Sequence, residues 1–221
     1  MSGDKLTPLQ RRILRALAGR FTPSWTLTGG AALAGFHLKH RPTRDLDLFW
    51  RGQPMLGALP REVEEILRGA GLEVATVQAG GTFHQLRVTD GPDVCIVDLV
   101  AERAVPLERP LQAEIDGRPL LLDSPHEILV NKLCALLGRA ELRDLRDLKA
   151  LLESGLDLGR ALAAAPKKDA GFSALTLAWV LKELQPASVA KQYGLSDAEA
   201  AELATFHSQL IQHLLTSTAP E

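Results

Sequence analysis

The sequence predicts an α+β protein, in which a mixed sheet flanked by helices is followed by a helical C-terminal lobe. Helical and extended patterns alternate over residues 7–123, and the pattern over residues 124–216 is helical throughout. Hydrophobic residues make up 46% of the 221 positions, which is enough for a sizeable core. We therefore expect a sheet-containing domain at 1–123 and a helical lobe at 124–221.

The first elements are marked by capping, glycine and proline signals. Thr7 and Pro8 suit the N-cap and the first turn of a helix, and Pro42 disfavours helix in the residue before it. Gly29 and Gly30 turn the chain between a short strand and an alanine-rich helix. The predicted elements are a helix over 7–19, a strand over 24–28, a helix over 31–40, a strand over 45–50 and a helix over 60–70.

The middle of the chain reads as strands joined by turns. The turn 90–93 (DGPD) favours an antiparallel hairpin, and Asp116-Gly117 favours a second, smaller one. The predicted strands are 73–78, 83–89, 94–100, 111–115 and 118–122.

From Ser124 onward the sequence is helical. Ser124, Pro125 and Glu127 have the form of a capping box that opens a helix. The predicted helices are 124–137, 141–153, 156–164, 171–184 and 196–216.

The composition indicates a cellular compartment, but it does not indicate whether the protein binds nucleic acid. Cys95 and Cys134 lie in apolar runs, which favours reduced thiols over a disulfide framework. The start lacks a signal peptide, and no run approaches the ~18 apolar residues of a membrane helix. We expect a soluble cytoplasmic protein with no membrane partner. The net charge of −2 neither favours nor excludes nucleic acid.

Acidic residues interrupt two strands that otherwise read as buried. Asp45 and Asp47 project from the same face of their strand, whereas Leu46 projects from the other. Asp98 is the single charge in the apolar run 94–100. If the two strands are neighbours, three carboxylates converge, and a divalent cation held by oxygen ligands would offset their repulsion. Taken alone, a D-x-D pair is more often a solvated strand edge.

The glycine pair supplies a second feature of the same kind. Gly29 and Gly30 have no Cβ, so backbone N–H groups at the start of the following helix can approach an anion. A tight strand-to-helix turn can use the same pair for steric reasons alone. The ordered set of a phosphate cradle, paired acids and a third acid on a later strand favours a phosphate and metal site.

These motifs resemble the nucleotidyltransferase superfamily that includes DNA polymerase β. Within it, the sequence is most similar to the AbiEii-type nucleotidyltransferase toxins of bacterial toxin–antitoxin and phage-defence systems. The matching segments are GGAAL (29–33), RPTRDLDLF (41–49), VDLV (97–100), NKLCALLGR (131–139) and RDLRDL (143–148). No diagnostic motif follows residue 155.

The resemblance implies a polymerase β-like core and roles for individual residues. Asp45, Asp47 and Asp98 would bind two Mg²⁺ ions, with Mn²⁺ as an alternative, and would be catalytic together with Lys132 and Asp147. The implied nucleotide-binding residues are Thr28, Gly29, Gly30, Arg41, Thr43, Arg44, Arg139 and Arg143. Asp144 is an alternative to Asp147, and its structural interpretation is an ion pair with Arg143 or Arg146.

The implied reaction transfers NMP from an NTP to an acceptor hydroxyl and releases pyrophosphate. The resemblance suggests an RNA acceptor, in particular the 3′ end of a tRNA, and a cognate antitoxin as a further partner. The helical lobe would complete the active-site cleft. The basic residues that could guide RNA are Arg11, Arg12, Arg15, Lys39, Arg41, Arg139, Arg143, Arg146, Lys167 and Lys168. The alternatives are a non-catalytic nucleotide- or partner-binding protein and an antibiotic-modifying nucleotidyltransferase.

Other residues that attract attention have plainer interpretations. His84 lacks a metal-ligand partner at useful spacing and is interpreted as structural. Trp25, Trp50 and Trp179 are predicted to be core residues.

Overall fold

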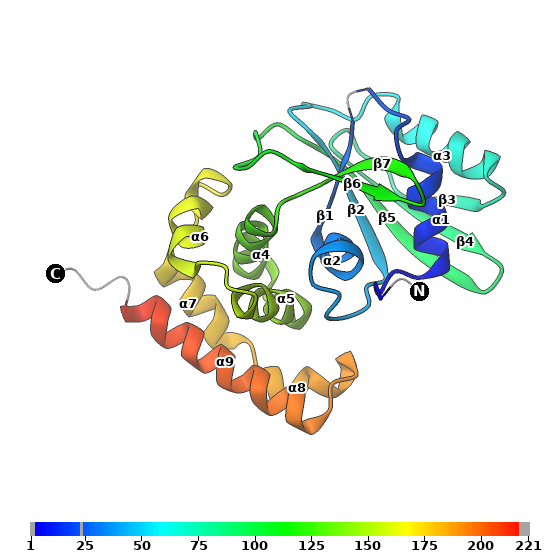
Figure 1. Cartoon of the computed structure of the whole chain (residues 1–221). Helices are drawn as coiled ribbons and strands as arrows, with labels where there is room; N and C mark the ends of the chain where they lie inside the picture. Colours follow the sequence, from blue (N-terminus) through cyan, green and yellow to red (C-terminus); the bar gives the residue numbers. More distant parts are fainter. Residues whose placement is uncertain (1–2, 23, 217–221) are drawn as a thin grey trace. The chain divides into compact units, whose positions relative to one another are not determined.

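The structure is a computed structural model that describes residues 3–22 and 24–216 (Figure 1). The chain forms two compact units, Met1–Ser124 and Pro125–Glu221. Each unit has its own secondary structure and its own core, and each is described separately below.

In the described residues of the first unit, seven strands form one mixed sheet in the order β3-β4-β5-β2-β1-β7-β6. The pairs β2–β5 and β1–β7 are parallel, and the other neighbouring pairs are antiparallel. The mixed sheet and its flanking helices confirm the predicted fold class. The strands are β1 (Thr26–Thr28), β2 (Asp45–Arg51), β3 (Glu73–Gln78), β4 (Phe83–Asp90), β5 (Asp93–Glu102), β6 (Leu111–Ile115) and β7 (Arg118–Leu122).

Helices α1 (Pro8–Leu17) and α3 (Leu59–Gly69) pack together on one side of this sheet (Figure 1). Thr7 and Gln10 form a reciprocal capping box at the start of α1, as Thr7 predicts. The apolar side of α1 is buried, and Phe21 meets Trp50 of β2 edge-to-face with 5.7 Å between ring centroids.

The second strand has one buried side and one polar side. Leu46, Leu48 and Trp50 are fully buried, whereas Asp45 and Asp47 alternate with them and are only partly covered. The expected alternation of faces is confirmed. The apolar side of the sheet therefore forms the core, and the acids project from the opposite side.

The segment around the glycine pair differs from its prediction at both ends. The strand is shorter than 24–28, because the side chain of Trp25 turns into the core and its Nε1 donates to the carbonyl of Leu17. Helix α2 (Gly29–Ala32) begins at the glycine pair, not at Ala31, and continues as a π-helical turn over Leu33–His37. The helix ends before His40 because the N–H groups of Leu38 and Lys39 both bond to Leu33 and Lys39 has a φ of 55°.

The second unit is helical, as predicted from Ser124 onward. Helix α4 packs against α5, α6 and α7, and α9 packs against α5, α7 and α8. The sequence gives no signal for the four-residue α8. The helices are α4 (Pro125–Arg139), α5 (Leu142–Glu153), α6 (Leu158–Ala164), α7 (Ala174–Glu183), α8 (Pro186–Val189) and α9 (Asp197–Thr216).

The prediction that Trp179 is a core residue is wrong. Trp25 and Trp50 are buried, but the Trp179 side chain on α7 is 62% exposed and carries the Lys182 ammonium 4.8 Å from its ring centroid. Apolar runs on short helices do not reveal which side faces the core, and α7 is hydrophobic nearly all round.

Glu127, which the sequence assigns to a capping box, is buried in an ion pair. Glu127 forms an ion pair with Lys168, and both side chains are buried. The Ser124 hydroxyl donates to Glu108. Lys168 is therefore not available to an RNA path, which corrects its place in the basic set.

Among the described residues, no helix combines the length and the apolar character needed to cross a membrane.

Candidate active site

A row of polar side chains crosses four strands of the first unit. Thr28 of β1 is opposite Asp47 of β2, Asp47 is the register partner of Asp98 of β5, and Asp98 is opposite Gln85 of β4. Register partners project from the same side of a sheet, so these four side chains share one face. The parallel pairing of β2 with β5 is what brings Asp98 beside the Asp45–Asp47 pair.

Hydrogen bonds orient two of the three acids, Asp45 and Asp98. Oγ1 of Thr43 donates to Oδ1 of Asp45 over 2.6 Å, and Nε2 of Gln85 donates to Oδ1 of Asp98 over 2.9 Å. Thr43 is buried, and its own carbonyl accepts a hydrogen bond from Gln10 of α1. The acids are thus held by a shell that is itself anchored in the core.

The glycine turn lies directly against this row. Gly29 has a φ of 63°, and a Cβ at this position would overlap Oδ2 of Asp47 and approach its Cγ to 3.2 Å. A Cβ on Gly30 would lie 2.9 Å from Oγ1 of Thr43 and 3.4 Å from Nη2 of Arg41. Both glycines are required by backbone conformation or by close approach, and the structure unites the two motifs that the sequence separates by 14 residues.

Three observations bear on whether this site suits magnesium. The donors are carboxylate oxygens, the ligand type that Mg²⁺ prefers. Oγ1 of Thr28 is buried beside Asp47 without a hydrogen-bond partner in the described residues. No group of three His, Cys, Asp or Glu side chains within the described chain is gathered as a metal centre. Since Mg²⁺ commonly takes one or two carboxylates together with substrate phosphates, the donor set fits, and the metal stays a prediction.

The second unit contains a separate buried charge cluster. Nζ of Lys132 on α4 lies 2.7 Å from Oδ1 of Asp144 and 2.8 Å from Oδ2 of Asp147, both on α5. Nε of Arg139 lies 2.8 Å from Oδ2 of Asp144. Both aspartates have no exposed surface. Asp144 therefore pairs with Lys132 and Arg139, and not with Arg143 or Arg146 as interpreted from the sequence.

The cluster keeps Lys132 and Asp144 charged. Burial lowers the pKa of the Lys132 ammonium, but the charges of Asp147 and Asp144 outweigh it, and the pKa is raised above its ordinary value. Burial raises the pKa of Asp144, but the Lys132 charge and the hydrogen bond from Arg139 outweigh it, and the pKa is lowered. Two aspartates of the same unit therefore supply the negative charge that the buried Lys132 ammonium needs.

The predicted nucleotide-binding arginines lie in both units. Arg41 covers Gly30, and its Nη1 donates to the carbonyl of Pro42. The side chain of Arg44 is exposed next to Asp45. Arg143 of the second unit pairs with Glu141, over 2.6 Å between Nε and Oε2. Nucleotide contacts by Arg139 and Arg143 stay predictions.

Gln85 and His84 are neighbours on β4 and project from opposite faces of the sheet. Gln85 was not predicted, although its alternation with the buried Leu86 places it on the polar face. His84 projects from the opposite face, where its Nε2 lies 3.7 Å from Oε1 of Glu64 on α3, in line with its structural interpretation.

Both cysteines are expected to react slowly in the folded protein. Burial, with the charges of Asp45, Asp98 and Asp47, raises the pKa of Cys95 to about 12. Burial, with the charge of Asp169, raises the pKa of Cys134 to about 11. Because the thiolate is the nucleophile, iodoacetamide at neutral pH should alkylate Cys95 more slowly than Cys134, and both more slowly than in guanidinium. Native labelling of Cys95 at the unfolded rate would contradict this burial.

A mixed sheet with a strand-to-helix glycine turn beside carboxylates on two parallel strands is the arrangement that the resemblance to nucleotidyltransferases predicts. The chain belongs to the AbiEii family, because the model for "Nucleotidyl transferase AbiEii toxin, Type IV TA system" matches residues 12–213. The resemblance seen in the motifs is thereby confirmed.

Solved structures agree on the fold. A candidate nucleotidyltransferase from H. pylori is 18% identical, with a TM-score of 0.53 and coverage of 96% of each chain. JHP933 from Helicobacter pylori is 21% identical, with a TM-score of 0.52 and coverage of 95% of this chain and 92% of its own. No curated protein matches the sequence. At these identities the likeness concerns the fold alone.

Proposed function

We propose that this nucleotidyltransferase transfers NMP from an NTP to a hydroxyl of an RNA acceptor, with the 3′ end of a tRNA as the first candidate. The observation that carries the proposal is the position of Asp47, which lies against the Gly29 turn on one side and beside Asp98 on the other. A triphosphate at the turn and a cation at the carboxylates would then be adjacent.

Asp45, Asp47 and Asp98 would hold magnesium, which when bound supplies positive charge to the phosphates and lowers the pKa of the acceptor hydroxyl. The chain itself contributes orientation. Thr43 and Gln85 fix Asp45 and Asp98 in place, and the absence of a Cβ at Gly29 and Gly30 leaves backbone N–H groups accessible to phosphate oxygens. Arg41, above Gly30, adds a guanidinium suited to the same oxygens.

The family description names a toxin of a type IV toxin–antitoxin system. We extend this to the chain as a proposal, in which the transfer is toxic to the cell and an antitoxin protein counteracts it.

The direct test is label transfer from each NTP in turn to total RNA in the presence of Mg²⁺. We expect Asp47→Asn and Asp98→Asn to lower transfer by at least ~10²-fold, beyond the 10–100-fold typical of an outer-shell partner. Asp93→Asn is the matched control, because it removes an exposed carboxylate from the same strand as Asp98. Transfer by Asp47→Asn at the wild-type rate would refute the site.

Metal binding has its own readout. Added Mg²⁺ should raise the melting temperature of the wild type and of Asp93→Asn but not of Asp47→Asn, since a ligand stabilises only the state that binds it. A Mg²⁺-dependent shift with NTP, but without transfer to any acceptor, would instead support a non-catalytic nucleotide-binding protein.

A further inference from the structure

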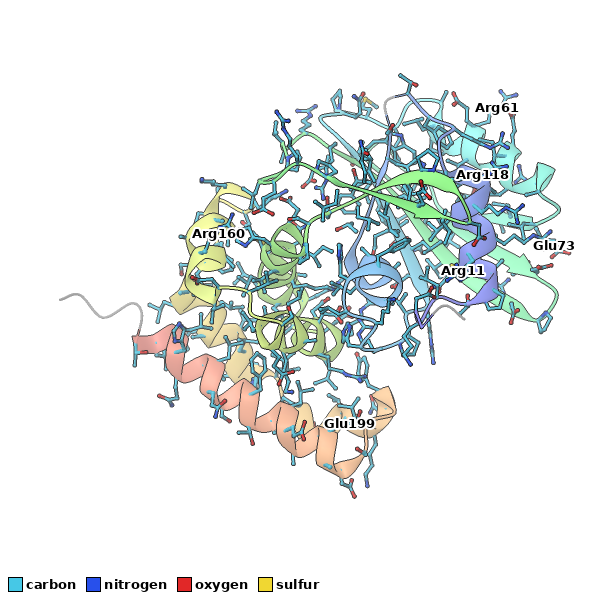
Figure 2. The ribbon with its side chains drawn as sticks, in the orientation of Figure 1. Arg11, Arg61, Glu73, Arg118, Arg160 and Glu199 are labelled. Carbon is cyan, nitrogen blue, oxygen red and sulfur yellow. The ribbon has the colours of Figure 1, made fainter. Side chains whose placement is uncertain are left out.

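The first unit has a second polar feature, a basic cavity on the side of the sheet away from the acids. The cavity of about 460 Å³ lies between the C-terminal parts of α1 and α3 and the start of β7. Within the described part of the chain, no carboxylate lines it. Its lining residues are Arg12, Arg15, Ala16, Arg20, Ile66, Gly69, Ala70 and Arg118. Figure 2 shows Arg118 at β7, beside α1.

The charges of this cavity are mostly not neutralised. Arg12 forms an ion pair with Asp90 and donates to the carbonyl of Ala70. The side chains of Arg15, Arg20 and Arg118 make no hydrogen bond or ion pair within residues 3–22 and 24–216. Like charges around one cavity repel one another, and a bound anion removes that repulsion. Guanidinium groups are the side chains best matched to phosphate.

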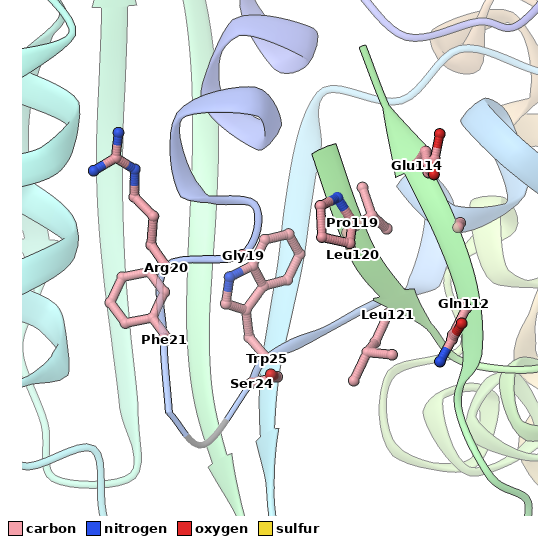
Figure 3. Close-up of a pocket in the computed structure, with 11 residues that line it drawn as sticks. Gly19, Arg20, Phe21, Ser24, Trp25, Gln112, Glu114, Pro119, Leu120 and Leu121 are labelled. Carbon is pink, nitrogen blue, oxygen red and sulfur yellow. The ribbon is translucent and has the colours of Figure 1, made fainter. Parts of the chain in front are cut away.

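A neighbouring cavity favours a nucleotide ligand over a purely acidic one. This slot of about 380 Å³ shares Arg20 with the basic cavity. Figure 3 shows its walls, with Trp25 and Phe21 on one side and Pro119 and Leu120 on the other. Ser24, Gln112 and Glu114 also line the slot, so it combines apolar walls with hydrogen-bonding groups. Beside the guanidinium groups of the basic cavity, this mixture suits a ligand that joins aromatic rings, polar groups and phosphates.

The position of the basic cavity sets the size of the ligand. Leu122 at the end of β7 is the register partner of Leu27, next to Thr28 of the polar row. Arg118 is at the other end of β7, about 13 Å away at ~3.3 Å per residue. Helix α3 also lies on the opposite face of the sheet, because its Glu64 meets His84 and not Gln85. A small acceptor cannot reach both places, whereas a folded RNA can.

We propose that Arg15, Arg20 and Arg118 bind backbone phosphates of the RNA acceptor, at a surface separate from the carboxylates. The identity of the ligand as the acceptor depends on the proposed function. The binding step itself does not, because it requires neither NTP nor metal.

The test measures anisotropy of a fluorescein-labelled RNA hairpin in EDTA, without NTP, between about 50 and 200 mM salt. The triple variant Arg15→Gln/Arg20→Gln/Arg118→Gln should bind at least ~10-fold more weakly. The slope of log Kobs against log salt concentration should become shallower by about 2–3, because each arginine that no longer neutralises a phosphate removes ~0.7 in single strands and ~0.9 in a duplex. The triple Lys variant at the same positions should retain most of the slope, because the charge remains.

The matched control is Arg61→Gln/Arg103→Gln/Arg109→Gln, which removes the same charge from exposed arginines outside the cavity. It should bind RNA nearly as the wild type does, and circular dichroism should show that all variants are folded. Asp47→Asn should retain RNA affinity although it loses transfer. The two proposals can therefore fail separately. Absence of transfer would count against the proposed function, whereas RNA binding that does not depend on the cavity arginines would count against the further inference.

Four results would overturn the inference. Three of them are wild-type affinity in the cavity variant, an equal loss in the control variant, and an effect on polyglutamate binding with none on RNA. Competition by millimolar inorganic phosphate that is as strong as competition by unlabelled RNA would point to a small-anion site and would also overturn it.

Discussion

Lys132→Met should destabilise the second unit by about 3–5 kcal/mol, the range for breaking a buried ion pair by removing one partner. The reason is the burial of Asp144 and Asp147, which have no exposed surface and share the Lys132 ammonium at 2.7 and 2.8 Å. Arg139 still pairs with Asp144 in the variant, whereas the ion pair between Asp147 and Lys132 is lost. Urea unfolding of the full chain, followed by circular dichroism, measures the change.

A matched control and a rescue variant separate this effect from loss of any lysine. Lys149→Met removes a lysine of α5 whose pair with Glu153 is at the surface, and it should cost less than about 1 kcal/mol. Lys132→Met/Asp147→Asn removes a buried carboxylate together with its lysine partner and should recover part of the loss. Equal stability of the Lys132 and Lys149 variants would show that the buried cluster does not support the fold.

The effect of Lys132→Met should also depend on pH in a defined direction. The pKa of Asp144 is lowered on folding, so its stabilisation is present above its ordinary value of 3.8 and is lost as pH falls below it. The pKa of Lys132 is raised, so its contribution is lost only as pH rises beyond 10.5. The difference between wild type and variant should be constant between these limits and shrink in acid.

Gly29→Ala should be the most damaging glycine substitution in the first unit. The left-handed backbone costs an alanine about 1–2 kcal/mol. Its Cβ would also overlap the Asp47 carboxylate, and crowding of this kind costs a further ~1–3 kcal/mol. Denaturant unfolding gives the stability, and the transfer assay should show a parallel loss of activity as Asp47 is displaced.

Gly91→Ala isolates the contact with Asp47. Gly91 has a φ of 58° and open space where a Cβ would be, so only the backbone cost applies. In an Asp47→Ala background, Gly29→Ala should cost no more than Gly91→Ala does, because the carboxylate is gone. If Gly29→Ala and Gly91→Ala were equally mild in the wild-type background, the packing of the turn on the acid row would be disproved.

Local signals made much of the fold and the acid row predictable. Alternation within 45–50 assigned Asp45 and Asp47 to one face, and the isolated charge in 94–100 marked Asp98. Their convergence depends on the parallel register of β2 with β5, which follows from tertiary pairing over some 50 residues. A single sequence does not encode that pairing in any local pattern.

Side-chain partners across elements were harder to predict. Asp144 was interpreted as a structural partner of Arg143 or Arg146, yet Lys132 and Arg139 from α4 supply the charges beside it. The end of the helix after Gly30 was also mistaken, because a π-helical turn has no sequence signature as clear as a capping residue or a proline. Both failures arise where contacts between elements outweigh local preference.

The place of β1 in the sheet has a consequence for the newborn chain. This strand emerges from the ribosome early, but one of its two neighbours is β7, whose residues follow it by about a hundred positions. Until β7 has been synthesised, β1 has an unpaired edge, and the parallel pair of β1 with β7 has high contact order. Truncated products ending before residue 118 should therefore be aggregation-prone.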